Sequence, residues 1–250
     1  MNIRQPAVAG SFYPAEAGRL RGMIERFLAE TAVADPMLPK AIIAPHAGYV
    51  YSGPIAASAY AHVRAGREVI RWVVMLGPAH RVFVRGLAAS SAAAFATPLG
   101  EAPVDGTAVQ SILDLPQVQV RDDAHAHEHS LEVHLPFLQV VLDEFAIVPL
   151  AVGEVTAEAV SQVLERLWGG PETLILISSD LSHYLDYAAA QKLDGQTAQA
   201  INQLLPQAIG QDQACGRLPI QGLLNAAQAH QLKVNCVDLR NSGDTAGPRD

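Results

Sequence analysis

Short apolar runs alternate along the chain with segments in which apolar residues recur every three or four positions. Such runs predict strands buried on both faces of a sheet, and the recurring positions predict amphipathic helices. We expect strands at residues 40–44, 69–76, 82–89, 118–120, 145–152, 173–177 and 233–239, of which 82–89 is the more exposed. We expect helices at residues 20–28, 54–63, 105–113, 128–144, 156–168, 187–205 and 219–230.

Proline and capping residues set several of these boundaries. Gly77 and Pro78 should end the second strand, because proline cannot donate to a strand ladder. Asp105 is placed to cap the helix that follows it, and Pro136 should kink or delay its own helix. The alternation of strands and helices predicts an α/β fold with a mainly parallel or mixed central sheet flanked by helices. We expect a single domain over residues 1–250.

Composition narrows the class of protein. Of the 250 residues, 50% are hydrophobic and 17% charged, which is enough for a large core. The 17 basic and 25 acidic residues give a net charge of −8, which argues against general nucleic-acid binding. No apolar run approaches the roughly 20 residues that cross a bilayer, so we expect no membrane span. With two cysteines and no secretory leader, we expect a reducing, cytoplasmic compartment.

The chain holds nine histidines, and several of them follow predicted strands. His46 and His80 come just after the first two strands, and Asp180 and His183 follow the strand at 173–177. Ligands of open α/β sheets bind at the carboxyl ends of the strands, so these side chains should meet there. Two imidazoles and an anionic ligand suit zinc, iron, copper or manganese with positions left open. The alternative is that each histidine only forms hydrogen bonds within its own loop.

Both cysteines have two interpretations. Cys215 lies just before a predicted helix and near Arg217, and both features lower the pKa of a thiol. It is therefore a candidate thiolate ligand or nucleophile, with burial as the alternative. Cys236 lies inside the predicted last strand, where we expect it to pack in the core.

The remaining histidines form a tract and an isolated pair. The tract is dense in imidazoles, and its geometry depends on whether the segment is extended or helical. The simpler interpretation is a solvated loop from which one or two imidazoles reach the cleft expected at the carboxyl ends of the strands. The isolated pair lies near predicted helix ends, where we expect a structural role. The tract is His125, His127, His129 and His134, and the pair is His62 and His230.

Six segments resemble the Memo family, which in prokaryotes appears as AmmeMemoRadiSam system protein B. They occur in family order and span nearly the whole chain. They are residues 4–14 (RQPAVAGSFYP), 44–53 (APHAGYVYSG), 77–80 (GPAH), 128–137 (EHSLEVHLPF), 178–183 (SSDLSH) and 215–217 (CGR).

The resemblance implies a fold similar to the class III extradiol ring-cleaving dioxygenases, which are non-haem iron enzymes. By position, His46 and His80 would be metal ligands, and Cys215 would stand where those enzymes have a glutamate. His183 would take the acid/base place, with Asp180 beside it. Thiolate in place of carboxylate shifts the preference toward copper, zinc or thiolate-bound iron. Ring cleavage itself therefore does not follow from the resemblance.

The resemblance also implies partners and leaves the function open. We expect a metal-binding, redox or dioxygenase-like protein with iron or copper and an unidentified small-molecule or peptide ligand. The alternatives are an adaptor that uses the same pocket for a peptide or partner, and a zinc-dependent hydrolase. AMMECR-type and radical SAM proteins are expected partners by resemblance.

The end of the chain departs from the family pattern. Prokaryotic members of the family usually continue after a Ser-Gly-Asp segment, here residues 242–244, into a further apolar strand. This sequence instead reaches Asp250 after Pro248 and Arg249. An exposed sheet edge, with self-association into a homo-oligomer across it, is the resulting expectation.

Overall fold

The computed structural model describes residues 2–33, 37–247 and 249, so Pro248 and Asp250 lie outside the described residues. The strands are β1 Ile3–Arg4, β2 Ala41–Ala44, β3 Trp72–Pro78, β4 Leu87–Ala89, β5 Ala94–Thr97, β6 Gly100–Pro103, β7 Val118–Val120, β8 Ala146–Val152 and β9 Thr173–Ser178. The α-helices are α1 Ala17–Ala29, α2 Tyr49–Val63, α3 Gly106–Gln110, α4 Asp122–Ala126, α5 Leu135–Val141, α6 Ala157–Arg166, α7 Tyr187–Asn202 and α8 Arg217–Ala229. The 3-10 helices are η1 Arg64–Gly66, η2 Glu132–His134, η3 Pro206–Ala208 and η4 Ser242–Asp244.

A six-stranded mixed sheet forms the centre of the molecule, in the order β2-β9-β3-β8-β4-β7. The pairs β2·β9, β9·β3, β3·β8 and β4·β7 are parallel, and β4 runs antiparallel to β8. The predicted α/β fold with a mainly parallel or mixed sheet is therefore confirmed. A second sheet, β1-β5-β6, was not predicted, because its strands are short and lack a long apolar run.

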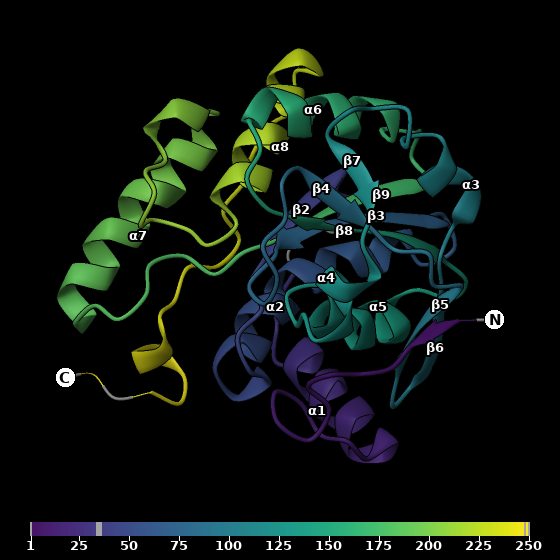
Figure 1. Cartoon of the computed structure of the whole chain (residues 1–250). Coiled ribbons are helices and arrows are strands. Elements are labelled where there is room, and N and C mark those ends of the chain that lie inside the picture. Colours follow the sequence, from purple (N-terminus) through teal and green to yellow (C-terminus); the bar gives the residue numbers. More distant parts are fainter. Residues whose placement is uncertain (1, 34–36, 248, 250) are drawn as a thin grey trace.

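The two faces of the sheet bury different residues because successive side chains of a strand point to opposite faces. Val73 and Met75 of β3 pack with α1, α2 and α5, whereas Val74 and Leu76 pack against α6 and α8. Figure 1 shows these helix layers on opposite sides of the sheet, with α7 beyond the β2 edge. In the described part of the chain, no helix is both long and apolar enough to span a membrane.

Most predicted elements form, and several boundaries follow the expected physics. Asp105 caps α3 by accepting from the backbone N–H of Ala108. Pro136 delays its helix as expected, since η2 precedes α5 and the proline occupies the first turn of α5. The helix expected at 54–63 begins earlier, at Tyr49, and includes Pro54. The strand at 69–76 extends to Pro78 instead of stopping before it.

Two predicted strands are wrong. Of residues 82–89, only Leu87–Ala89 forms a strand, with an isolated bridge from Arg85 to Glu154 before it. This short strand is buried rather than exposed because β8 and β7 flank it. Residues 233–239, all of them described, pair with no strand. They line a cavity beside β2 instead of extending the sheet. The apolar alternation of this segment predicts a face that is buried, and lining the cavity buries that face without pairing to the free edge of β2.

Candidate functional site

Three neighbouring strands deliver polar residues to one edge of the sheet. β2, β9 and β3 are adjacent and parallel, so their carboxyl ends meet. His46 follows β2, His80 follows β3, and Asp180 follows β9. The backbone N–H of Ser179 donates to the Ala44 carbonyl over 2.9 Å, which ties the two loop origins together.

Cys215 reaches the same edge from the loop before α8. Its backbone N–H donates to the Asp180 carbonyl over 3.2 Å, and Gly216 donates to Ser179 Oγ over 2.9 Å. A Cβ atom on Gly216 would lie 2.6 Å from the Ser178 carbonyl oxygen, so only glycine permits this close approach. The approach places Cys215 Sγ 3.3 Å from His46 Nε2.

Ligand-type atoms of His46, His80 and Cys215 lie within 4.8 Å of one another. A second group, His80, Glu128 and His129, satisfies the same distance. The centroids of the His46 and His80 rings are 5.2 Å apart, and the His129 ring stacks on His80 at 4.8 Å. The structure thus brings the three predicted ligands together, while metal binding itself stays a prediction.

Glu128 anchors His80 from the buried side. Its carboxylate accepts hydrogen bonds from the His80 backbone N–H at 2.6 Å, from His80 Nδ1 at 3.0 Å and from the Ser130 N–H at 2.9 Å. Burial opposes ionisation of Glu128, but the hydrogen bonds from His80 and Ser130 lower its pKa to about 2. Burial also opposes protonation of His80, yet Cys215 and Glu128 raise the pKa of His80 to about 9.

His46 is held by a wholly buried chain of polar groups. Its Nδ1 lies 2.6 Å from Ser178 Oγ, and His134 Nε2 lies 2.9 Å from the same oxygen. On its other side His134 Nδ1 lies 2.9 Å from the Tyr60 hydroxyl. Burial, followed by the nearby His80 and His129, holds the pKa of His46 well below its usual value, and burial lowers that of His134 to about 3. Both rings are therefore neutral at neutral pH.

The other two predicted site residues have different positions. Asp180 Oδ1 accepts from the backbone N–H groups of His46 and Ala47 at 2.8 and 3.3 Å, while its Oδ2 lies 3.9 Å from His46 Nε2. Asp180 thus fixes the loop that carries His46. His183 is exposed on the loop after β9 and is absent from both groups of ligand-type atoms found among the described residues.

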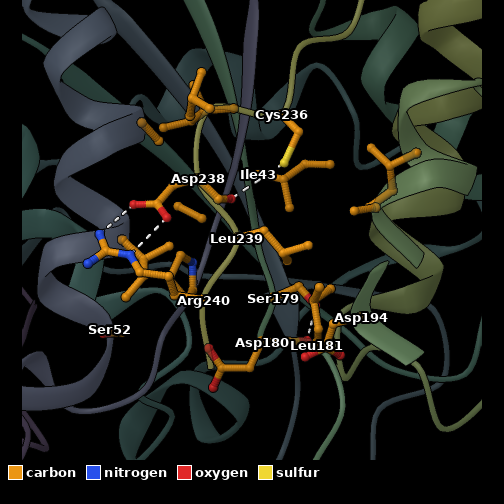
Figure 2. Close-up of a pocket in the computed structure, with 18 of the residues that line it drawn as sticks. Ile43, Ser52, Ser179, Asp180, Leu181, Asp194, Cys236, Asp238, Leu239 and Arg240 are labelled. Carbon is orange, nitrogen blue, oxygen red and sulfur yellow. Dashed lines mark hydrogen bonds and ion pairs between the residues drawn. The ribbon is translucent and has the colours of Figure 1, made fainter. Parts of the chain in front are cut away.

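A large, mainly apolar cavity of about 1380 Å³ adjoins the site. Asp180, His129 and His183 line it together with β2, α7 and the C-terminal segment. Figure 2 shows this cavity with Asp180 near one end and the Asp238–Arg240 ion pair on the C-terminal segment. Asp180 and His129 thus connect the site to a space large enough for a small organic molecule, although His46, His80 and Cys215 do not themselves line it.

The histidine tract adopts neither of the two predicted geometries. His125 ends up buried on α4, where its Nε2 bonds to the Ala88 carbonyl, and His127 is exposed. His129 faces His46 and His80, while His134 is buried behind them in η2. The simpler interpretation is right only in part: one or two imidazoles do lie near the site, but the tract is not a solvated loop, because His125 and His134 are buried.

The remaining histidines and Cys236 have peripheral positions. His62 lies in the last turn of α2, and His230 follows α8, stacks on Trp168 and pairs with Glu165. Cys236 is exposed, so its predicted core packing is wrong. The physical reason is that the strand expected around it does not form.

The sequence did not single out Glu128, Ser130 and Ser178 as site residues. Each is buried, and each bonds to a site histidine or to a group that does. A signal was available for all three, because Glu128 and Ser130 lie in residues 128–137 and Ser178 begins residues 178–183, two of the segments that resemble the Memo family.

Comparisons with known proteins agree with these motifs. The Memo-like protein family model matches residues 4–250. A MEMO1 family protein of Aquifex aeolicus is 36% identical over 99% of this chain and 95% of its own length. A MEMO1 family protein of Aeropyrum pernix is 36% identical over 100% of this chain and 96% of its own length.

One solved structure shows a more distant likeness. The crystal structure of the uncharacterized protein JW3007 from Escherichia coli K12 has a TM-score of 0.48 and 13% identity, over 68% of this chain and 81% of that one. This likeness is too distant to carry a conclusion. The family model and the relatives, by contrast, span almost the whole chain, including the segments that carry the site residues. The chain belongs to the Memo family.

Proposed function

We propose that this Memo-family chain binds iron or copper through His46, His80 and Cys215 and performs redox chemistry on a small molecule. The observation that supports it best is the convergence of three ligand-type atoms within 4.8 Å, from three separate segments of the chain. Convergence from such distant positions is unexpected for histidines that only pair within their own loops.

The donor set and its surroundings fit a transition metal. Imidazole and thiolate donors favour iron, copper or zinc and do not suit magnesium or calcium. His46 is buried, whereas the His80 side chain is 30% exposed, so the group has one closed and one open side. Three protein ligands leave coordination positions free for a substrate. Bound iron or copper would supply one-electron redox chemistry there.

Other residues of the chain would support the metal ligands and the bound molecule. Asp180 holds the His46 loop through two backbone N–H groups. His183, on the cavity side, is placed to hold or move a proton at a molecule bound in the cavity. The apolar lining from β2 and α7 would exclude water around that molecule. A reducing cytoplasm would keep Cys215, a free cysteine, available as a thiolate ligand.

Elemental analysis of protein purified without oxygen tests the proposal. Wild type should hold iron or copper in stoichiometric amount, and Cys215→Ser and His80→Gln should lose most of it. Cys236→Ser and His230→Gln are matched controls, because each changes an exposed residue of the same type outside the group of proposed ligands. Equal metal in Cys215→Ser, His80→Gln and their controls would refute the ligand set.

Turnover then distinguishes the function classes. Oxygen consumption by the iron- or copper-loaded protein, lost in a His46→Ala, His80→Ala double variant, supports redox chemistry. Stoichiometric zinc together with oxygen-independent hydrolysis would refute the redox function and favour a zinc-dependent hydrolase. A metal-free protein that binds a peptide in the cavity would refute the redox function and favour an adaptor.

A further inference from the structure

Ser178 lies at the centre of a hydrogen-bond chain behind the proposed metal ligands. It is the last residue of β9, is fully buried, and its hydroxyl oxygen has three partners in the protein. These are the Ser130 carbonyl at 2.5 Å, His46 Nδ1 at 2.6 Å and His134 Nε2 at 2.9 Å. A hydroxyl group has one proton to donate and two lone pairs to accept with, so all its capacity is used here.

The Ser130 carbonyl decides the direction of every bond at this oxygen. A carbonyl can only accept, so the single proton of Ser178 points to Ser130. Both imidazole nitrogens must then donate to the Ser178 oxygen. His46 therefore carries its proton on Nδ1, and His134 carries its proton on Nε2.

The hydrogen bond at the Tyr60 end of this hydrogen-bond chain fits the same assignment of protons. A neutral His134 protonated at Nε2 has a lone pair at Nδ1, which must accept a proton from its partner. That partner is the buried Tyr60 hydroxyl, 2.9 Å away, which has a proton to give. Tyr60 thus donates to His134, His134 donates to Ser178, and no group in the chain is left unpaired.

His46 then presents its free lone pair to the site. With Nδ1 protonated, Nε2 is the unprotonated nitrogen, and it lies 3.3 Å from Cys215 Sγ. His80 directs Nδ1–H to the Glu128 carboxylate, which can only accept, so its Nε2 faces the same side of the site. Both imidazoles therefore direct Nε2 toward the thiol side of the site.

We propose that Ser178, oriented by the Ser130 carbonyl and supported by His134 and Tyr60, is a positioning residue that locks His46 in the Nδ1–H tautomer. The role of Ser178 in metal binding rests on the function proposed above. The tautomer assigned to His46 does not depend on that function. The competing arrangement has Nε2–H of His46 donating to a Cys215 thiolate and its Nδ1 accepting from Ser178. That arrangement would leave the Ser130 carbonyl without its donor.

Nitrogen NMR of the metal-free full chain tests the tautomers directly. Protein labelled with ¹⁵N-histidine at neutral pH is compared with His46→Gln and His134→Gln, which assign the two rings. We expect His46 protonated at Nδ1 and His134 protonated at Nε2. The opposite tautomer at His46, or an even mixture at either ring, overturns the proposal. If the tautomers are as expected but no metal binds, only the proposed function fails.

Two variants separate positioning from general support. Tyr60→Phe removes one hydroxyl and should loosen the tautomer of His134 while His46 keeps its own. Ser178→Ala should give mixed tautomers at His46 and weaken metal binding roughly 10- to 100-fold, as the loss of a group that orients a ligand does. Ser90→Ala, another buried serine, is the matched control and should change neither. Weaker metal binding in Ser178→Ala with wild-type tautomers would show a merely structural role, and wild-type affinity would also refute the proposal.

Discussion

The site has two walls that differ in how their polar groups are paired. The ligand wall comprises His46, His80, Cys215, Ser178 and residues 128–134. Most of its buried groups have partners on strand ends and neighbouring backbone, the exception being His129 Nδ1. The rim comprises residues 181–186 and 233–241, where Tyr184 is fully exposed and 233–239 pairs with no strand. Buried polar groups are costly to leave unpaired. The ligand wall is therefore fixed in geometry, while the rim is free to vary with the ligand.

The largest expected effect is a loss of folding stability at low pH, caused by the buried histidine of the ligand wall. Between about pH 6.5 and 3 the unfolded chain binds a proton at His134 that the folded chain excludes, because burial lowers its pKa to about 3. Stability therefore falls as pH falls through this window, by roughly 5 kcal/mol from this group when complete. Urea unfolding of metal-free protein from pH 6.5 to 4 should show a steeper loss in wild type than in His134→Gln. Parallel curves would contradict the buried neutral ring.

A methyl group at Gly216 should distort the same wall. Its Cβ would lie 2.6 Å from both the Ser178 carbonyl oxygen and Ser179 Cβ, so backbone must move. We expect Gly216→Ala to lower the free energy of unfolding by about 1–3 kcal/mol, as overpacking does. Gly195→Ala, a helical position with open space around its Cβ, is the control and should stabilise by up to about 1 kcal/mol. Denaturation midpoints measure the stability of both variants. Equal effects of Gly216→Ala and Gly195→Ala would refute the close approach of Gly216 to Ser178.

Glu128→Gln should weaken the hold on His80 without removing a ligand. The amide has one acceptor oxygen for the several N–H groups that now share the carboxylate. Since such supporting groups are worth roughly 10- to 100-fold in metal affinity, titration with Fe(II) should show a loss of that size. Glu165→Gln, which pairs with His230 at the surface, is the matched control. Unchanged Fe(II) affinity would place Glu128 outside the machinery.

The rim should tolerate change. Tyr184→Ala removes a fully exposed side chain and keeps a non-glycine residue at φ 59°, so backbone strain is the same. We expect less than about 0.5 kcal/mol change in the free energy of unfolding and unchanged metal content. A larger loss of either would show that the two walls are coupled.

Local pattern predicted most of the fold, for reasons visible in particular elements. β9 is buried on both faces, β2 alternates buried and half-buried positions, and both runs are mainly apolar. The residues after them, His46 and Asp180, could be assigned to one sheet edge by the rule for parallel strands. The pattern failed for residues 233–239, because the apolar alternation says nothing about whether a partner strand is present.

The sequence by itself determined the α/β order, the strand-end position of His46 and His80, and the motifs of the Memo family. Only the tertiary structure decided that Cys215 reaches His46, because a glycine's close approach joins segments distant in sequence. It alone gave the proton order around Ser178, since Ser130, His134 and Tyr60 meet only after folding. Hydrogen-bond direction depends on which acceptors surround a donor, and no local pattern carries that information.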